Sequence, residues 1–305
     1  MRFYVEYYVV KAFLLLTKLL PNNAVYGLCN GIVHLFFTFN KRRRLLTLAN
    51  LHLAYPEKSD EAIFTLAKKA YESVGITLAE IFLIYYDRLD IDTLIANKEE
   101  AIAGLNRYLS GNDVGKFCIT AHFSNWELLA LFSAKSGHPI KTIARDGDNP
   151  LIDEKIVKVF RGKYGNKVIG KQNAIISLVK TIKEGSVGAI LFDQKPKKNN
   201  SVETLFFNQP VRTINVIAQL KLKYNPRIVP IFIARRLDGK YEVIIKEPVE
   251  YVAAEASDPS LKIALITQRY NDILEEVIRI YPEQWFWMHN RWKIPKKKLP
   301  KESVA

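Results

Sequence analysis

Short apolar runs alternate with amphipathic stretches from about residue 57 onward. Runs of about four to eight apolar residues are typical of buried strands, whereas apolar residues spaced three or four apart are typical of helices that cover a sheet. We predict strands at 117–121, 140–144, 187–192, 228–234 and 241–245. We predict helices at 59–86 (one or two, with Ser59 as N-cap), 99–109, 126–135, 151–163, 174–183 and 211–223. This alternation predicts an α/β fold with a central, mostly parallel or mixed sheet flanked by helices.

Two apolar runs, 3–20 and 24–39, form the N-terminus. The first run carries Glu6, Lys11 and Lys18, and a helix that spans a bilayer rarely tolerates three charges. The second run is shorter than the roughly 20 residues that a crossing needs. A signal peptide is not favoured, because the first run contains an acid and no small-residue cleavage site follows it.

A basic cluster at 41–44 ends the second apolar run. Aromatic residues, lysines and a basic cluster beside an apolar helix are typical of a segment that lies in a membrane interface. We therefore expect residues 1–44 to be a helical membrane-anchoring segment, with the basic cluster on anionic lipid of the cytoplasmic leaflet. The alternative is that these are outer helices of a soluble core. The anchor precedes a predicted α/β domain at 45–295 and a basic C-terminal tail at 296–305.

Composition and charge narrow the function classes. The chain has 305 residues, of which 49% are hydrophobic, so it is long and apolar enough to bury a sizeable core and is not disordered. Its two cysteines, Cys29 and Cys118, are expected to be small buried residues, too few for a disulfide scaffold or a structural zinc site. The net charge of +14 indicates an acidic partner: nucleic acid, anionic lipid or an acidic carrier protein. Nucleic acid is not favoured, since no recognition motif is evident.

The most informative motif lies where the predicted strand 117–121 ends and a helix begins. In open α/β sheets the site lies at the carboxyl ends of the strands, and His122 is placed there. A neutral imidazole can take a proton from a hydroxyl if a carboxylate holds its other nitrogen, and Glu127 is the candidate carboxylate. The alternative is a capping box, in which Glu127 only closes the helix N-terminus on Ser124.

The His122-to-Glu127 spacing resembles the HxxxxD/E motif of the glycerolipid acyltransferase superfamily, and its surroundings resemble the lipid A late acyltransferases of lauroyl and myristoyl type. Further segments are similar to motifs of that family: Asn50-Leu51 with Ala54-Tyr55-Pro56, Arg145 to Pro150 (RxxxNP), Arg161-Gly162, Asp193-Gln194, and Pro282 to Lys293 (PEQWxWxHxRWK). The resemblance covers nearly the whole chain. The sequence departs from the pattern at Lys195, at Asn208 in place of a glycine, and at Arg212 and Asn215 in the expected helix. Asparagine tolerates a left-handed backbone, so we expect the turn at Asn208 to persist.

The resemblance implies a cytoplasm-facing enzyme of the inner membrane. It implies transfer of a fatty acyl group from acyl carrier protein to the hydroxyl of a 3-hydroxyacyl chain on a lipid A precursor, with no cofactor and no metal. His122 is expected to be the general base, with Glu127 orienting its imidazole. Arg145 and Arg161 are expected to hold phosphates, carboxylates or the developing oxyanion, since a guanidinium binds such oxygens bidentately.

Asn149 and Asp193 complete the expected substrate-binding set. On the residues alone, each is also an ordinary turn residue, and Arg161 is also a solvated arginine near a helix end. Trp285, Trp287 and Trp292 are expected either at a membrane interface or in the core. Two other functions stay open: an acyltransferase of the same superfamily with another lipid acceptor, such as a phosphatidylinositol mannoside or a glycerolipid, and a non-enzymatic basic membrane or nucleic-acid binder.

Overall fold

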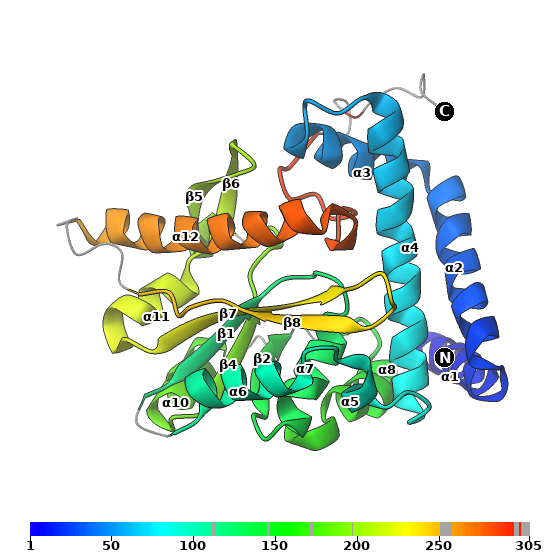
Figure 1. Cartoon of the computed structure of the whole chain (residues 1–305), viewed down its shortest axis with the longest axis horizontal. Coiled ribbons are helices and arrows are strands. Elements are labelled where there is room, and N and C mark those ends of the chain that lie inside the picture. The colour runs from blue at the N-terminus through cyan, green and yellow to red at the C-terminus, as the bar shows by residue number, and fades with distance from the viewer. Residues whose placement is uncertain are drawn as a thin grey trace.

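A computed structural model describes residues 1–111, 114–144, 147–170, 174–196, 198–250, 258–295 and 299. A six-stranded sheet with the order β3-β2-β4-β1-β7-β8 lies at its centre, with helices around it (Figure 1). All neighbouring strands are parallel except β7 and β8. The predicted α/β class with a mixed, mostly parallel sheet is confirmed.

Five of the six strands of this sheet match the predicted apolar runs, and the sixth, β3, was not predicted. The six strands are β1 (Lys116–Thr120), β2 (Ile140–Ala144), β3 (Lys167–Gly170), β4 (Val187–Leu191), β7 (Arg227–Arg235) and β8 (Tyr241–Ile245). A separate hairpin is formed by β5 (Ser201–Phe206) and β6 (Gln209–Ile214).

The helices fall into an N-terminal group and a group around the sheet. The first group is α1 (Arg2–Leu19), α2 (Asn22–Phe39), α3 (Lys41–Ala54) and α4 (Asp60–Tyr85). The second is α5 (Ile91–Leu94), α6 (Lys98–Leu109), α7 (Trp126–Lys135), α8 (Pro150–Ile152), a π-helical turn (Asp153–Val157), α9 (Lys158–Arg161), α10 (Ala174–Lys183), α11 (Val216–Tyr224) and α12 (Pro259–Ile280). Short 3₁₀ turns lie at Lys163–Gly165, Lys198–Asn200 and Pro282–Gln284. Ser59 caps α4 as predicted, because its hydroxyl accepts a hydrogen bond from the backbone N–H of Ala62.

The N-terminal segment consists of helices, as expected. Figure 1 shows α2 running along α4 on the side away from the sheet. The two helices approach closely at Gly75, where an added Cβ would lie 2.2 Å from Asn30 Oδ1. Within the described part of the chain, no helix combines the length and the apolar character that crossing a membrane requires.

The predicted helix at 211–223 is partly wrong. Residues 209–214 form strand β6, and the helix begins only at Val216. Alternate residues of this stretch, Val211 and Thr213, are buried, which is the period of a strand. Arg212 therefore lies in the hairpin and not in a helix, and its Nη1 is 2.8 Å from Glu203 Oε1 on β5.

The hairpin turn confirms the expectation for Asn208. Phe207 and Asn208 have φ values of 52° and 55°. A two-residue turn of type I′ needs positive φ at both central positions, and asparagine tolerates it better than most residues. The turn thus keeps its geometry without the family's usual glycine.

The C-terminal tryptophans belong to the core. Trp285 and Trp287 are fully buried, and Trp292 is partly buried against the same cluster. Their rings contact one another and Phe206 and Phe207 of the hairpin, at centroid distances of 4.7 to 6.5 Å. The membrane-interface interpretation of these tryptophans is wrong. Cys29 and Cys118 are buried, as predicted.

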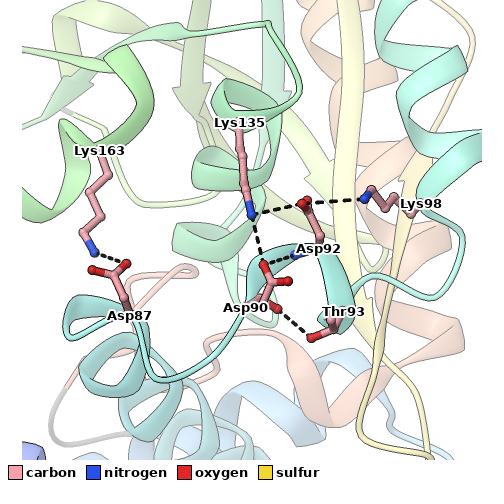
Figure 2. A network of polar contacts seen from close by, with 7 residues as sticks. All are labelled: Asp87, Asp90, Asp92, Thr93, Lys98, Lys135 and Lys163. Atoms are coloured by element: carbon pink, nitrogen blue, oxygen red, sulfur yellow. Dashed lines mark hydrogen bonds and ion pairs between the residues drawn. The ribbon is translucent and has the colours of Figure 1, made fainter.

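Surface ion pairs fasten the segment after α4 to the helices beside it. Figure 2 shows Lys135 between Asp90 and Asp92, and Lys163 pointing at Asp87. Exposed pairs of this kind contribute at most about 1 kcal/mol each. Lys163 has a second role, because its ammonium also donates to the carbonyls of Ile84 and Tyr85 at the end of α4. It thereby holds the end of α9 against α4.

The pairing of β1 with β4 requires a residue without a side chain at position 188, because Gly188 lies opposite the buried Phe117. A Cβ at residue 188 would lie 2.3 Å from Phe117 Cε1. We expect Gly188→Ala to lower the free energy of unfolding by about 1–3 kcal/mol, the usual cost of overpacking, measured by urea denaturation. Adding Phe117→Leu should restore part of the loss. Gly31→Ala on α2, whose Cβ would meet nothing within 4 Å, is the control and should not destabilise; equal stability of both variants would contradict the packing.

Candidate active site

His122 lies in a sharply constrained turn between β1 and α7. Phe123 pairs with Trp285 through an isolated antiparallel bridge, and the His122 carbonyl accepts from the N–H of Phe286 at 3.0 Å. Ser124 has a φ of 52°, a left-handed conformation that is unfavourable for a non-glycine residue. Its N–H donates to the Gln284 carbonyl at 2.7 Å, and its carbonyl accepts from Thr77 on α4 at 3.3 Å. Residues 284–286 and helix α4 therefore fix the turn together.

Asp193 holds the imidazole of His122. It follows β4, which lies beside β1, and its Oδ1 is 2.9 Å from His122 Nδ1. Its other oxygen accepts from the backbone N–H of His122 at 3.1 Å and from Trp285 Nε1 at 2.9 Å. Because an ionised carboxylate only accepts hydrogen bonds, this arrangement assigns the proton to Nδ1 and leaves Nε2 as the acceptor of the ring.

The carboxyl group of Asp193 is almost completely buried, with 2% of its residue surface exposed. Burial alone would raise its pKa, but the charge and hydrogen bonds of His122 and the indole of Trp285 outweigh burial and lower the pKa below its usual value. Asp193 is therefore an ionised, fixed partner that can stabilise a protonated His122.

The structure supports neither role predicted for Glu127, which were to orient the imidazole or to close a capping box. Its carboxylate is bonded to Arg161, with Nε 3.0 Å from each oxygen and Nη2 also on Oε1, and to Trp126 Nε1 at 3.2 Å. The imidazole is oriented by Asp193 instead. The capping box is also wrong, because Asn125 caps α7 by accepting from Leu128 N–H at 3.0 Å. The cap lies one residue after the predicted one, so Glu127 is the second residue of the helix, one short of the position that a capping box requires.

Arg161 is tied to the site by its pair with Glu127, so the interpretation as a solvated helix face is wrong. Burial lowers its pKa, but the carboxylate beside it outweighs burial, and the net shift is upward. The helix that carries it includes the π-helical turn at 153–157, a rare element that is enriched at functional sites. Trp126 connects this pair with His122, since its ring lies 5.0 Å from the imidazole centroid and its N–H donates to Glu127.

The remaining predicted site residues differ in position. Asn149 caps α8 by accepting from the N–H groups of Leu151 and Ile152. Its amide donates to the carbonyl of Phe3 and to Glu6 Oε2, at 2.8 and 2.9 Å, so it fastens α1 to the loop after β2. Arg145 lies outside the described residues, as do Lys197, the cluster 296–298 and residues 300–305 of the tail.

The sequence did not single out His289 and Gln194, which lie near His122 and Asp193. Gln194 Nε2 is 3.2 Å from His122 Nε2. His289 Nε2 accepts from the backbone N–H of Lys195 at 3.0 Å. Burial, the largest influence, lowers the pKa of His289 to about 4, so its ring is neutral at neutral pH and serves as an acceptor. The only sequence signal for either residue was its place in a family motif.

The loop that carries His289 is held by the N-terminal helices. Asn50 on α3 donates to the carbonyls of Trp287 and His289 at 2.8 and 2.7 Å, and Arg43 donates to that of Met288 at 2.9 Å. The sequence motif at 50–56 is thereby explained in part, because it binds the C-terminal motif. Among the described residues, His, Cys, Asp and Glu form no group of three or more that could hold a metal ion.

A buried carboxylate also supports the His122 turn. Glu80 on α4 is fully buried and accepts from Asn125 Nδ2 at 2.9 Å and from the hydroxyl of Tyr241. Burial raises its pKa, whereas its hydrogen bonds and Arg235 lower it, and the net shift is upward. Because Glu80 fixes the amide of Asn125, it sets the orientation of the residue that caps α7.

Comparison with known proteins identifies the family of the chain. The family described as bacterial lipid A biosynthesis acyltransferase matches residues 1–294. The lipid A biosynthesis lauroyltransferase of Escherichia coli (strain K12) is 28% identical over 284 residues, which are 92% of this chain and 89% of that protein. The palmitoleoyltransferase of the same strain is 24% identical, covering 84% and 80%. The myristoyltransferase is 24% identical, covering 81% and 74%. The chain therefore belongs to the bacterial lipid A biosynthesis acyltransferase family and is an acyltransferase.

Proposed function

We propose that this member of the family transfers a fatty acyl group from the thioester of acyl carrier protein to the hydroxyl of a 3-hydroxyacyl chain on a lipid A precursor. We place the reaction at the cytoplasmic face of the inner membrane. The observation that carries the proposal is the pair of Asp193 and His122 at the carboxyl ends of neighbouring parallel strands, in which Asp193 binds Nδ1 and Nε2 is left as the acceptor of the ring. Such a pair is suited to remove a proton from a hydroxyl.

The proposed reaction needs only proton transfer and one acyl shift. His122 Nε2 takes the proton of the acceptor hydroxyl while its oxygen attacks the thioester carbonyl. The resulting tetrahedral intermediate collapses, the carbon–sulfur bond breaks, and the imidazolium returns its proton to the leaving thiolate. Asp193 stabilises the imidazolium throughout, and the thioester supplies the activation, so no cofactor or metal is assigned a step.

Glu127 and Arg161 receive a different role from the one expected. Because they bind each other through two guanidinium nitrogens, the pair is neutral as a unit and Glu127 is not the partner of the imidazole. We assign the pair to holding Trp126 against His122, which fixes an aromatic ring beside the base. Arg145 and Asn149 stay proposed substrate-binding residues.

An apolar face on α1 and α2 supports membrane attachment. Side chains on the outer face of these helices are exposed, among them Tyr4, Val5, Tyr8, Val9, Leu15, Leu16, Leu19, Ile32, Leu35, Phe36 and Phe39. Monomeric soluble proteins rarely expose apolar patches of this extent. We propose that this outer face lies in the membrane interface, with the basic cluster 41–44 at the headgroups. Because Asn149 fastens α1 to the loop after β2, a bilayer on this face would lie next to the loops at the carboxyl edge of the sheet, which supports the proposal.

The catalytic assignment predicts a ranking of variants. We expect Asp193→Asn to lower kcat by about 10³-fold or more, because an amide no longer fixes the Nδ1–H tautomer or stabilises the imidazolium. His122→Ala should lose transfer to a similar extent. The assay combines purified protein, acyl carrier protein thioester and a tetraacylated lipid A precursor, and mass spectrometry measures the gain of one acyl mass.

Asp238→Asn, in an exposed turn, is the matched control and should retain full activity. Circular dichroism checks that each variant is folded. Full activity of a folded Asp193→Asn protein would contradict the proposed base. If the unaltered chain acylates a glycerolipid or phosphatidylinositol mannoside and not the lipid A precursor, the chemistry stands and the acceptor is wrong.

The membrane proposal predicts the effect of removing apolar side chains from the outer face. Each large aliphatic side chain contributes about 1.5–3 kcal/mol when fully buried, and less when it is partly buried. We expect the combined substitution of Val5, Val9, Leu16 and Leu19 by serine to weaken binding by at least about 10²-fold. Flotation with vesicles of phosphatidylethanolamine and phosphatidylglycerol measures this.

A matched set of four substitutions lies elsewhere on the surface. Serine at Leu237, Leu261, Leu265 and Ile280, which are equally exposed but lie on the β7–β8 turn and α12, should leave vesicle binding unchanged. Equal binding of the two four-fold variants would refute the assignment of the outer face of α1 and α2 to the membrane.

A further inference from the structure

The side chain of Gln194 occupies the position that the acceptor hydroxyl needs. Its amide nitrogen is 3.2 Å from His122 Nε2 and donates to it, since Nδ1 carries the ring proton toward Asp193. The Nε2 atom has one lone pair, so it cannot accept from Gln194 and from a substrate hydroxyl in good geometry at once. A hydroxyl that gives its proton to His122 must therefore displace this amide.

The backbone of Gln194 is fixed while its side chain is less confined. On one side Asp193 is buried and holds three donors, and on the other the N–H of Lys195 donates to His289. The residue itself is only partly buried. After displacement, the amide can swing within reach of the reacting atoms without any movement of the main chain.

We propose that Gln194 is a catalytic residue: its amide first holds Nε2 in the resting site and then, displaced by the acceptor hydroxyl, donates an N–H to the thioester carbonyl oxygen. The inference rests on the proposed function. As the acceptor oxygen bonds to the carbonyl carbon, the proton of the acceptor hydroxyl moves to His122 Nε2. Negative charge then develops on the carbonyl oxygen. When the carbon–sulfur bond breaks, the carbonyl re-forms and the thiolate takes the proton from the imidazolium. Gln194 only donates a hydrogen bond, so no further reactant is required.

Among the residues that the structure describes, the groups that contact the imidazole leave this donor role open for a neutral amide. The charged partner is Asp193, the neighbouring His289 accepts a hydrogen bond, and the rings of Trp126 and Phe286 lie on other sides. Arg161 is bound to Glu127. A donor placed at a developing oxyanion typically contributes about 10²–10³-fold to kcat.

The first test compares Gln194→Ala with the unaltered chain in the transfer assay. We expect kcat to fall by about 10²-fold, while the KM for each substrate changes by less than about threefold, because the hydrogen bond forms mainly in the transition state. Gln219→Ala, an exposed glutamine on α11, is the matched control and should be fully active. A folded Gln194→Ala protein with unchanged or higher kcat would overturn the proposal, since an amide that merely blocks the base would give that result.

The second test uses Gln194→Glu, which keeps the size of the side chain but cannot donate when ionised. A carboxylate beside Nε2 favours the imidazolium, so activity should be lower than in the unaltered chain and should rise at higher pH than in Gln194→Ala. Coincident pH profiles of the two variants would show that residue 194 does not contact the base, against the proposal.

The proposed function and the role of Gln194 can be refuted separately. If the unaltered chain neither acylates the lipid A precursor nor hydrolyses the acyl carrier protein thioester, the proposed function is wrong and the role of Gln194 falls with it. If the unaltered chain is active and Gln194→Ala matches it, the proposed function stands and only the role of Gln194 is refuted.

Discussion

The buried carboxylate of Asp193 is the interaction on which the site depends. It accepts hydrogen bonds from the backbone and the ring of His122 and from the indole of Trp285. An unpaired charge in such a position would be very unfavourable, so the buried carboxylate needs these donors to stay ionised. One aspartate thus fixes the tautomer of the imidazole, the position of the His122 turn and the docking of the C-terminal loop.

The C-terminal loop explains why residues far apart in sequence act together. Trp285 reaches Asp193, Gln284 and Phe286 hold the main chain of the His122 turn, and Asn50 on α3 holds the loop from outside. The N-terminal helices are therefore part of the scaffold of the site as well as the candidate membrane surface. This coupling gives a physical reason for the proposed placement of the membrane next to the site.

Local sequence patterns predicted the larger part of the fold. Five strands of the central sheet followed from apolar runs. Three of them, β1, β4 and β7, are buried on both faces, and such strands are apolar almost throughout. The pattern failed at 209–214, where a polar hairpin strand runs directly into an apolar helix and the two periods merge. It also missed β3, a four-residue strand at the sheet edge that begins with a lysine.

The sequence predicted that His122 and Asp193 follow strands, but it did not predict that they pair, and it did not single out Gln194 or His289. The end of a strand correctly marked His122, and Asp193 was placed at the end of another. Which carboxylate faces the imidazole depends on β1 and β4 being neighbours, a non-local fact that the five-residue spacing of His122 and Glu127 cannot contain. Likewise, the pair of Glu127 with Arg161 depends on how α7 and α9 pack.

The most direct test of the account is the tautomer of His122. Nitrogen-15 NMR of protein labelled in its histidine rings, with His122 assigned through a His122→Gln variant, distinguishes a protonated ring nitrogen from an unprotonated one. At a pH at which the ring is neutral, the account predicts a protonated Nδ1 and an unprotonated Nε2, and loss of this single tautomer in Asp193→Asn. A proton on Nε2 in the unaltered chain, or the same spectrum in both proteins, would contradict it.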